Sequence, residues 1–223
     1  MIISDTEKFV FIHNPKVGGM SFRTVLGQYD TRENFFFEWK MVGDEGRQID
    51  MAHITPFQFR RFYPKIFEEM ADYYKFGFVR SPYNRYLSAV SQHLKLCTHY
   101  VRKALLQQPE LFYRIACNLA EHTLDVHAIE QDHRLVHFRR QMNFFHIDRK
   151  MWADGIFKLE DTAQIAEPKV TKWIGEALLI PKNQTREYSE NGYDLTQLDK
   201  RTIARINEFY AGDFERFSYD KID

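Results

Sequence analysis

The sequence has few cysteines, no net charge and no long hydrophobic run. Cys97 and Cys117 are its only cysteines, too few for the disulfide framework of a small secreted domain. The 31 lysines and arginines balance 31 aspartates and glutamates, so the overall charge does not indicate nucleic acid as a partner. No apolar stretch approaches the roughly 20 residues that span a bilayer, and the polar start MIISDTEK does not resemble a signal peptide. We therefore expect neither membrane insertion nor nucleic acid binding.

Features that would divide the chain into domains are also missing. No linker rich in Pro, Gly or Ser, no internal repeat and no low-complexity tract interrupts the sequence. A chain of 223 residues with 44% hydrophobic residues is long enough for one well-buried domain and short for two. Residues 1–223 are therefore expected to form a single domain.

A loop containing glycines follows the first apolar run. Phe9–Ile12 is typical of a short buried strand, Lys16, Gly18 and Gly19 lie in the next stretch, and Ser21 begins a helical pattern. Backbone N–H groups at a helix start bind anions, and glycines let a phosphate approach the backbone closely. From these residues alone, both a phosphate site and a purely structural strand–turn–helix remain open.

The order of residues in this loop narrows the choice. In the P-loop of nucleoside triphosphatases, G-x-x-x-x-G-K-[ST], the lysine follows the second glycine, whereas Lys16 precedes both Gly18 and Gly19. The stretch from Pro15 to Ser21 resembles instead the 5′-phosphosulfate loop of sulfotransferases, of the type P-K-x-G-[GS]-[TS]-[ST]. Their donor is 3′-phosphoadenosine-5′-phosphosulfate (PAPS).

A second motif supports this resemblance. Tyr74–Arg80 is a strand-like run, and Ser81 and Pro82 form a typical cap and first turn of the helix that follows. The pattern R-S-P-Y-x-R-Y-x-S-A resembles the 3′-phosphate motif of the same family, in which seven residues separate the arginine from the serine. Arg80 and Ser88 occupy these two positions.

The chain thus resembles the PAPS-dependent carbohydrate sulfotransferases, especially the branch with heparan sulfate 2-O and chondroitin-type enzymes and short bacterial relatives. Weaker similarity covers His137–Phe145, Phe157–Asp161 and the stretch from Tyr210. The alternation of strands and helices favours an α/β fold with a mostly parallel central sheet and a helical insertion, and the resemblance implies a P-loop-like, three-layer arrangement. Animal Golgi relatives carry membrane anchors and disulfides, so this sequence indicates a cytoplasmic, bacterial enzyme with reduced cysteines.

The resemblance assigns donor-binding roles to three groups of residues. The group that would bind the 5′-phosphosulfate comprises Lys16, Gly18, Gly19, Met20, Ser21 and Phe22. The group that would bind the 3′-phosphate comprises Arg80 and Ser88. In a late polar loop, Lys182 and Arg186 either close over the donor or are ordinary surface charges. The product would be adenosine 3′,5′-bisphosphate (PAP), and the family's chemistry needs no metal.

His53 is the candidate general base. Gln48–Ile54 is typical of a strand, and Thr55 and Pro56 mark a helix start, so His53 is expected at the carboxyl end of a parallel strand, near Lys16. A lone histidine is more often structural, but the resemblance gives this one the task of taking the proton of the acceptor hydroxyl. Its unperturbed pKa of about 6.5 suits that task near neutral pH. The predicted reaction is in-line transfer of a sulfuryl group from PAPS to a hydroxyl.

The acceptor is the least determined part of the prediction. A saccharide is favoured, and Trp39 is either a packed aromatic residue or a platform for a sugar ring. His133 and His137 are spaced as a metal pair on an α-helix, but no third ligand has a recognised spacing. Two other functions remain open, a nucleoside-phosphate kinase and a non-catalytic module that binds bisphosphonucleotides. The sequence does not predict the oligomeric state.

Overall fold

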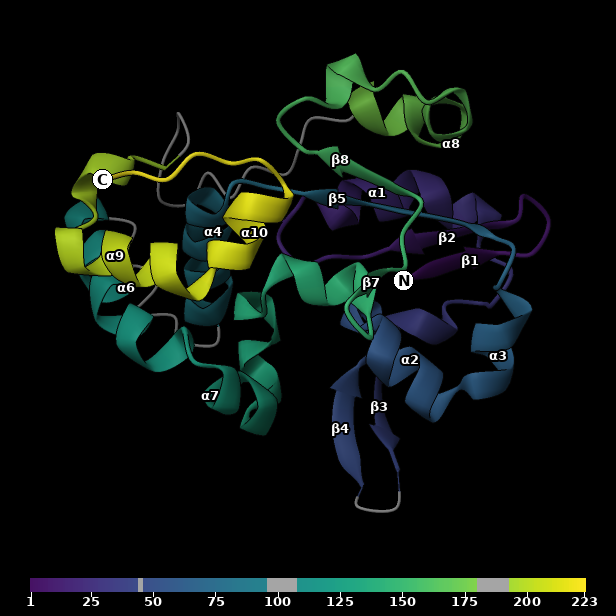
Figure 1. Cartoon of the computed structure of the whole chain (residues 1–223), viewed down its shortest axis with the longest axis horizontal. Coiled ribbons are helices and arrows are strands. Elements are labelled where there is room, and N and C mark those ends of the chain that lie inside the picture. Colours follow the sequence, from purple (N-terminus) through teal and green to yellow (C-terminus); the bar gives the residue numbers. More distant parts are fainter. Residues whose placement is uncertain (44–45, 96–107, 180–192) are drawn as a thin grey trace. The chain divides into compact units, whose positions relative to one another are not determined.

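A computed structural model of the chain describes residues 1–43, 46–95, 108–179 and 193–223 (Figure 1). These residues form two compact units, each made of two segments of the chain. Met1–Val79 and Gln141–Lys182 belong to the first unit, and Arg80–Arg140 and Asn183–Asp223 belong to the second. Among the described residues, no helix combines the length and apolar character needed to cross a bilayer.

A four-stranded sheet with the order β1-β2-β5-β8 forms the centre of the first unit. Its strands are β1 (Ile2–Ser4), β2 (Phe9–Ile12), β5 (Tyr74–Val79) and β8 (Gly155–Lys158). β1 is antiparallel to β2, whereas β2, β5 and β8 are parallel to one another. The predicted α/β class is therefore confirmed, with a mixed sheet. Because the parallel strands share a direction, the segments that follow them begin at one edge of the sheet.

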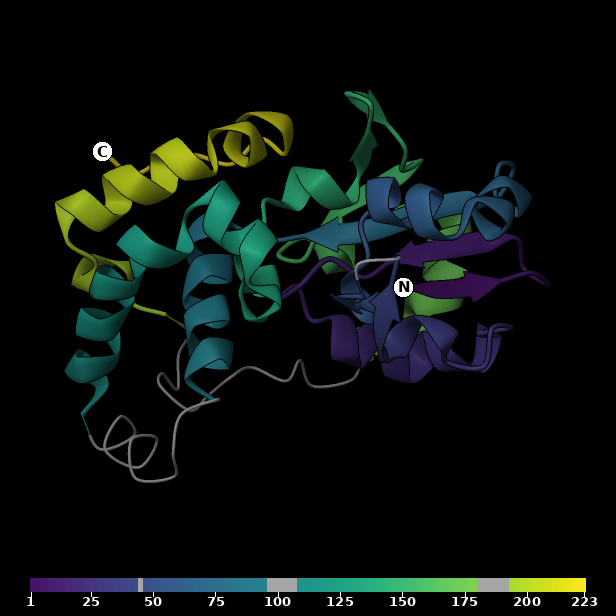
Figure 2. The ribbon, with the colours of Figure 1, turned by 90° about the horizontal axis from the view of Figure 1, so that it is seen from below.

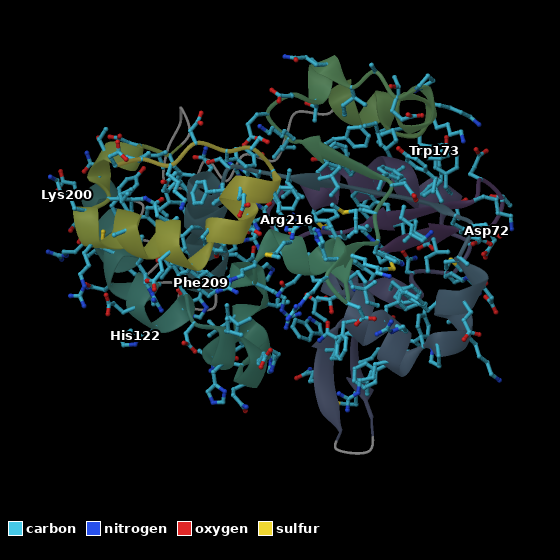
Figure 3. The ribbon with its side chains drawn as sticks, viewed as in Figure 1. Asp72, His122, Trp173, Lys200, Phe209 and Arg216 are labelled. Carbon is cyan, nitrogen blue, oxygen red and sulfur yellow. The ribbon has the colours of Figure 1, made fainter. Side chains whose placement is uncertain are left out.

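Helices cover both faces of this sheet. They are α1 (Gly19–Leu26) and α8 (Pro168–Leu179) on one face, and α2 (Pro56–Phe62) and α3 (Pro64–Glu69) on the other. Successive side chains of a strand point to opposite faces, so Phe9 and Phe11 pack with α1 and α8, whereas Val10 packs on the other side. Trp173 of α8, labelled in Figure 3, lies with its ring centroid 4.5 Å from that of Phe9.

Two small hairpins complete the first unit. β3 (Trp39–Val42) pairs antiparallel with β4 (Arg47–Asp50), and β6 (His146–Ile147) pairs with β7 (Lys150–Met151). The β3-β4 hairpin extends away from the central sheet, past α2 (Figure 1). The prediction of a strand from Gln48 to Ile54 in the parallel sheet is therefore wrong. The strand ends at Asp50, belongs to the hairpin, and continues into a 3-10 helix, η3 (Met51–His53).

The second unit is helical where the structure describes it. Its helices are α4 (Pro82–Leu94), α6 (Pro109–Thr123), α7 (Val126–Gln131), α9 (Lys200–Phe209) and α10 (Ala211–Arg216). Figure 2 shows α9 and α10 at the yellow end of the chain, and their buried faces share one apolar core with α4 and α6. The helical insertion predicted before residue 143 is confirmed for its described part, which starts at residue 108.

Candidate active site

The glycine loop after β2 leads directly into helix α1. Gly18 is the N-cap of the helix with φ at 78°, a left-handed conformation that glycine adopts without strain. Gly19 is needed for a different reason, because a Cβ at this position would lie 1.9 Å from Nε2 of His13. No side chain of the described residues caps this helix start. The amides at the start of α1 therefore point out of an uncapped helix end, the arrangement that favours an anion.

The other predicted residues of this loop contribute in different ways. Lys16 is half-buried and has φ at 65°, and Ser21 is buried in the first turn of α1. Met20 has an exposed side chain. The ring of Phe22 is stacked on Phe78 with a centroid distance of 4.0 Å. That ring belongs to the core, and the Phe22 amide donates to the Gly18 carbonyl at 3.4 Å. Phe22 therefore supports the start of α1, whereas Lys16 and Ser21 carry polar side chains.

His53 is the last residue of η3, and helix α2 begins at Pro56; both helices are capped at their starts. The Asp50 side chain accepts a hydrogen bond from the Ala52 amide at 3.0 Å and caps η3. Thr55 caps α2, and its hydroxyl and the Gln58 side chain form a reciprocal capping box. His53 Nδ1 donates to the carbonyl oxygen of His13 at 2.8 Å. His53 thus lies beside the first residue after β2, although it reaches this place from the hairpin and not from a strand of the central sheet.

This hydrogen bond determines the tautomer of the neutral imidazole. Because a carbonyl oxygen only accepts, Nδ1 carries the proton and Nε2 carries the lone pair. Nε2 lies 3.8 Å from Oδ2 of Asp50. Burial lowers the pKa of His53, and the charge of Lys16 lowers this pKa further, whereas the Asp50 carboxylate and the His13 carbonyl act in the opposite direction. The environment therefore favours a neutral histidine at neutral pH, with its basic nitrogen at Nε2.

His13 is a residue of this site that the sequence reasoning missed. Its ring centroid lies 4.6 Å from that of His53, and its Nε2 occupies the space that a side chain at Gly19 would need. His13 therefore contacts both the predicted base and the first residue of α1. The sequence feature that could have identified His13 is its position directly after the apolar run Phe9–Ile12, at the carboxyl end of the strand.

Asn14 connects the ends of two parallel strands beneath this loop. Its buried side-chain Nδ2 donates to the carbonyl of Phe78 at 2.9 Å and to Oε1 of Gln141 at 3.1 Å. On the far side, a Cβ at Gly18 would lie 3.4 Å from Leu159, the residue that follows β8. The loop is thus packed over the carboxyl ends of β2, β5 and β8, as the sequence predicts for a ligand-binding edge.

The second predicted donor motif begins the second unit. Arg80 follows β5 directly and is half-buried, Ser81 is the N-cap of α4 with Pro82 at its first position, and Ser88 is buried. The helix start predicted from Ser81 and Pro82 is therefore confirmed. The remaining predicted donor residues, Lys182 and Arg186, lie outside the described residues.

Arg85 belongs to the same motif but has a structural role. Its side chain is fully buried, and its guanidinium donates to the carbonyl of Arg139 and lies 5.7 Å from the ring centroid of Tyr210. The Tyr210 hydroxyl in turn donates to the carbonyl of Phe138 at 2.7 Å. Arg85 therefore joins α4 to the segment before residue 141 and to the C-terminal helices of the second unit.

Histidines of the second unit do not form the helical pair that their spacing suggests. His133 and His137 lie in a 3-10 helix, η4 (His133–Phe138). With about three residues per turn, side chains four apart in such a helix do not share a face. Within the described ranges, no three side chains of His, Cys, Asp or Glu lie close enough to hold a metal ion.

Comparison with known proteins gives one match, to a family. The model of the sulfotransferase family matches residues 1–220, which is nearly the whole chain. Searches of curated proteins and of solved structures returned no match.

Proposed function

Since the chain belongs to the sulfotransferase family, we propose that this sulfotransferase takes its sulfuryl group from PAPS and passes it to a hydroxyl of a saccharide, with His53 as the general base. The family predicted from the two motifs is confirmed by the match. The observation that best supports the finer proposal is the 2.8 Å hydrogen bond from His53 Nδ1 to the His13 carbonyl. This bond holds the His53 ring against the residue that begins the segment containing the glycine loop.

The loop is suited to the phosphosulfate end of the donor. Gly18 has no side chain to cap the start of α1, and Gly19 has no Cβ beside the loop. Lys16 supplies a positive charge. The amides of Ser21 and Phe22 donate to the Gly18 carbonyl, so the amides from Gly18 to Met20 and the hydroxyl of Ser21 are the groups that would hold the anionic oxygens. Arg80 and Ser88 are proposed to bind the 3′-phosphate, on the basis of the sequence motif that contains them.

When bound, PAPS would supply a sulfuryl group attached to its 5′-phosphate. The 5′-phosphate is the leaving group. His53 Nε2 takes the proton of the acceptor hydroxyl as the oxygen forms its new bond to sulfur. Lys16 neutralises the negative charge that develops on the bridging oxygen as the bond between sulfur and that oxygen breaks. Asp50, 3.8 Å from Nε2, stabilises the imidazolium. The sulfated acceptor and PAP are the products, and the proton remains on His53 until solvent removes it.

Calorimetric titration with PAP, AMP and ATP tests the donor assignment. PAP is expected to bind more tightly than AMP or ATP, because only PAP carries a 3′-phosphate. Arg80→Ala is expected to remove this preference, because Arg80 is the proposed ligand of that phosphate. Incubation with PAPS carrying a labelled sulfuryl group and a panel of saccharides then tests transfer. Equal or tighter binding of ATP would instead support a kinase, and PAP binding without transfer to any acceptor would support a non-catalytic module.

A further inference from the structure

One face of the β3-β4 hairpin carries large apolar side chains in contact with solvent. Trp39 is 45% exposed and Met41 is 67% exposed. Alternation along β3 places both on the same face, about 6.8 Å apart. The other face of the hairpin faces the core, since Val42 and Ile49 are buried in the cluster that covers the sheet. The exposed face is therefore not the one that stabilises the fold.

The register of the hairpin connects this face to His53. Trp39 is paired with Asp50, and Met41 is paired with Gln48. Directly opposite residues of an antiparallel pair lie on the same face, with Cβ atoms roughly 4.5–5.5 Å apart. The Asp50 carboxylate lies 3.8 Å from Nε2 of His53. Trp39 is thus next to a residue that contacts the base, on the same surface.

We propose that this hairpin face is the acceptor subsite and that the indole of Trp39 stacks on a pyranose ring of a saccharide acceptor. This inference rests on the proposed function and adds to it the surface that binds the acceptor and the side chain on which the sugar stacks. The ring would lie against Trp39, and one of its hydroxyls would reach His53 Nε2 past Asp50.

The chemistry of the face favours a sugar over an acyl chain or a lipid surface. Each exposed apolar side chain lies opposite a polar one, Asp50 for Trp39 and Gln48 for Met41. A pyranose has an apolar C–H face and a rim of hydroxyls, so an aromatic platform beside a carboxylate and an amide satisfies both parts. The Asp50 carboxylate already accepts from the Ala52 amide, but a purely apolar ligand would cover the exposed side-chain amide of Gln48 without offering it a hydrogen bond.

The test is direct binding to a printed array of neutral and acidic oligosaccharides, with the protein saturated with PAP. The affinity of the strongest ligand is then measured by calorimetry. Trp39→Ala is compared with Trp39→Phe and with Met151→Ala, a matched control because Met151 is 50% exposed on the separate hairpin strand β7. Trp39→Ala is expected to weaken glycan binding about tenfold or more, Trp39→Phe to restore part of it, and Met151→Ala to leave it unchanged. PAP affinity should be equal in all four proteins.

Several outcomes would overturn the inference. Equal glycan affinity in Trp39→Ala would remove the residue from the subsite. A protein that binds PAP but no glycan, or that binds phosphatidylcholine vesicles through Trp39 and no glycan, would assign the face to another ligand. Failure of the proposed function is distinguishable from these results. If glycans bind in a manner that depends on Trp39 but PAP does not bind, the donor assignment is wrong and the saccharide subsite is supported.

Discussion

The single proton on neutral His53 determines how this residue is able to act. Nδ1–H is bonded to the His13 carbonyl at 2.8 Å, so a proton taken from an acceptor must bind at Nε2, which faces Asp50. The His13 carbonyl fixes the orientation of the His53 ring, and the side chain of His13 packs against that ring. Because the carbonyl belongs to the backbone, a substitution at His13 would leave this hydrogen bond in place.

Replacement of His53 by alanine removes the proposed base and leaves the glycine loop in place. We expect the transfer rate to fall by about 10²- to 10⁴-fold, the usual contribution of a positioned base, while the Kd for PAP changes little. Steady-state transfer and calorimetry measure the two quantities separately. His122→Ala, at an exposed position of α6 labelled in Figure 3, is the control. Near-normal turnover of His53→Ala would remove His53 from the mechanism.

The pH dependence of the reaction follows from the same environment. His53 is active when neutral, so kcat/KM should rise with pH as the residue loses its proton. Burial lowers its pKa, which places the midpoint below the unperturbed value of about 6.5. Asp50→Asn removes a charge that raises this pKa but keeps an oxygen to accept from the Ala52 amide, so the midpoint should move to still lower pH. A midpoint above 6.5, or one that Asp50→Asn leaves unchanged, would contradict this assignment.

Gly19 and Gly27 provide a matched pair at the two ends of helix α1, since Gly19 is its first residue and Gly27 its C-cap. An alanine at Gly19 would place its Cβ 1.9 Å from His13 Nε2, whereas no heavy atom of the described chain lies within 4 Å of a Cβ at Gly27. Because His13 is buried against His53, it has little room to move, and we expect Gly19→Ala to cost about 1–3 kcal/mol of stability and to weaken PAP binding. Gly27→Ala should be neutral. Urea denaturation measures the stability of the two variants, and calorimetry measures their affinity for PAP. Equal stability of the two variants would show that His13 moves freely.

Sequence reasoning at this scale succeeded for backbone features and failed for packing. The strand Phe9–Ile12 and the helix after the glycine loop follow from local residue preferences, which a sequence displays, although the helix begins at Gly19 and not at Ser21. His13 contacts Gly19 across a loop and His53 from 40 positions away in the chain, and nothing in the residue pattern reports either contact. The packing of the Phe22 ring on Phe78 was likewise not visible in the local pattern.

At the scale of elements, the sequence predicted two strands of the central sheet and missed a shorter one. The apolar run Phe9–Ile12 and the strand-like run Tyr74–Arg80 predicted β2 and β5, although Lys75 lies within β5. β1 has three residues and was missed, because so short a run has no measurable period. The strand before His53 was placed in the wrong sheet, since strand propensity does not specify a pairing partner.

The capping box of α2 is the element-scale feature that holds the segment after His53. Thr55→Ala removes the side-chain acceptor of the Gln58 amide, and we expect it to lower the free energy of unfolding by about 1 kcal/mol. Thr24→Ala, at an exposed position within α1, is the control and should cost less, because alanine is a better helix former than threonine. Denaturant titration compares them. An effect of Thr55→Ala no larger than that of Thr24→Ala would mean that the cap contributes little here.

At the scale of the whole molecule, the two donor motifs fall in different compact units. The boundary between Val79 and Arg80 divides the strand of the second motif from its helix, at a point where no linker composition signals a boundary. The single domain expected from the sequence remains a prediction, as does the binding of one donor molecule by both motifs. A donor analogue that contacts both motifs would test the second prediction directly.

Hydrogen exchange with and without PAP tests whether both motifs bind the same molecule. If they do, PAP should slow amide exchange in residues 16–22 of the first unit and in residues 80–88 of the second, and α10 should serve as an internal control that does not change. AMP, which lacks the 3′-phosphate, should protect the first stretch alone. With Arg80→Ala, PAP should behave as AMP does with the wild type.

At a ligand concentration of 100 times the Kd, PAP should stabilise the protein by about 2.7 kcal/mol. Protection by PAP that is confined to one stretch would remove the other motif from the donor site, because a molecule held by both must slow exchange in both.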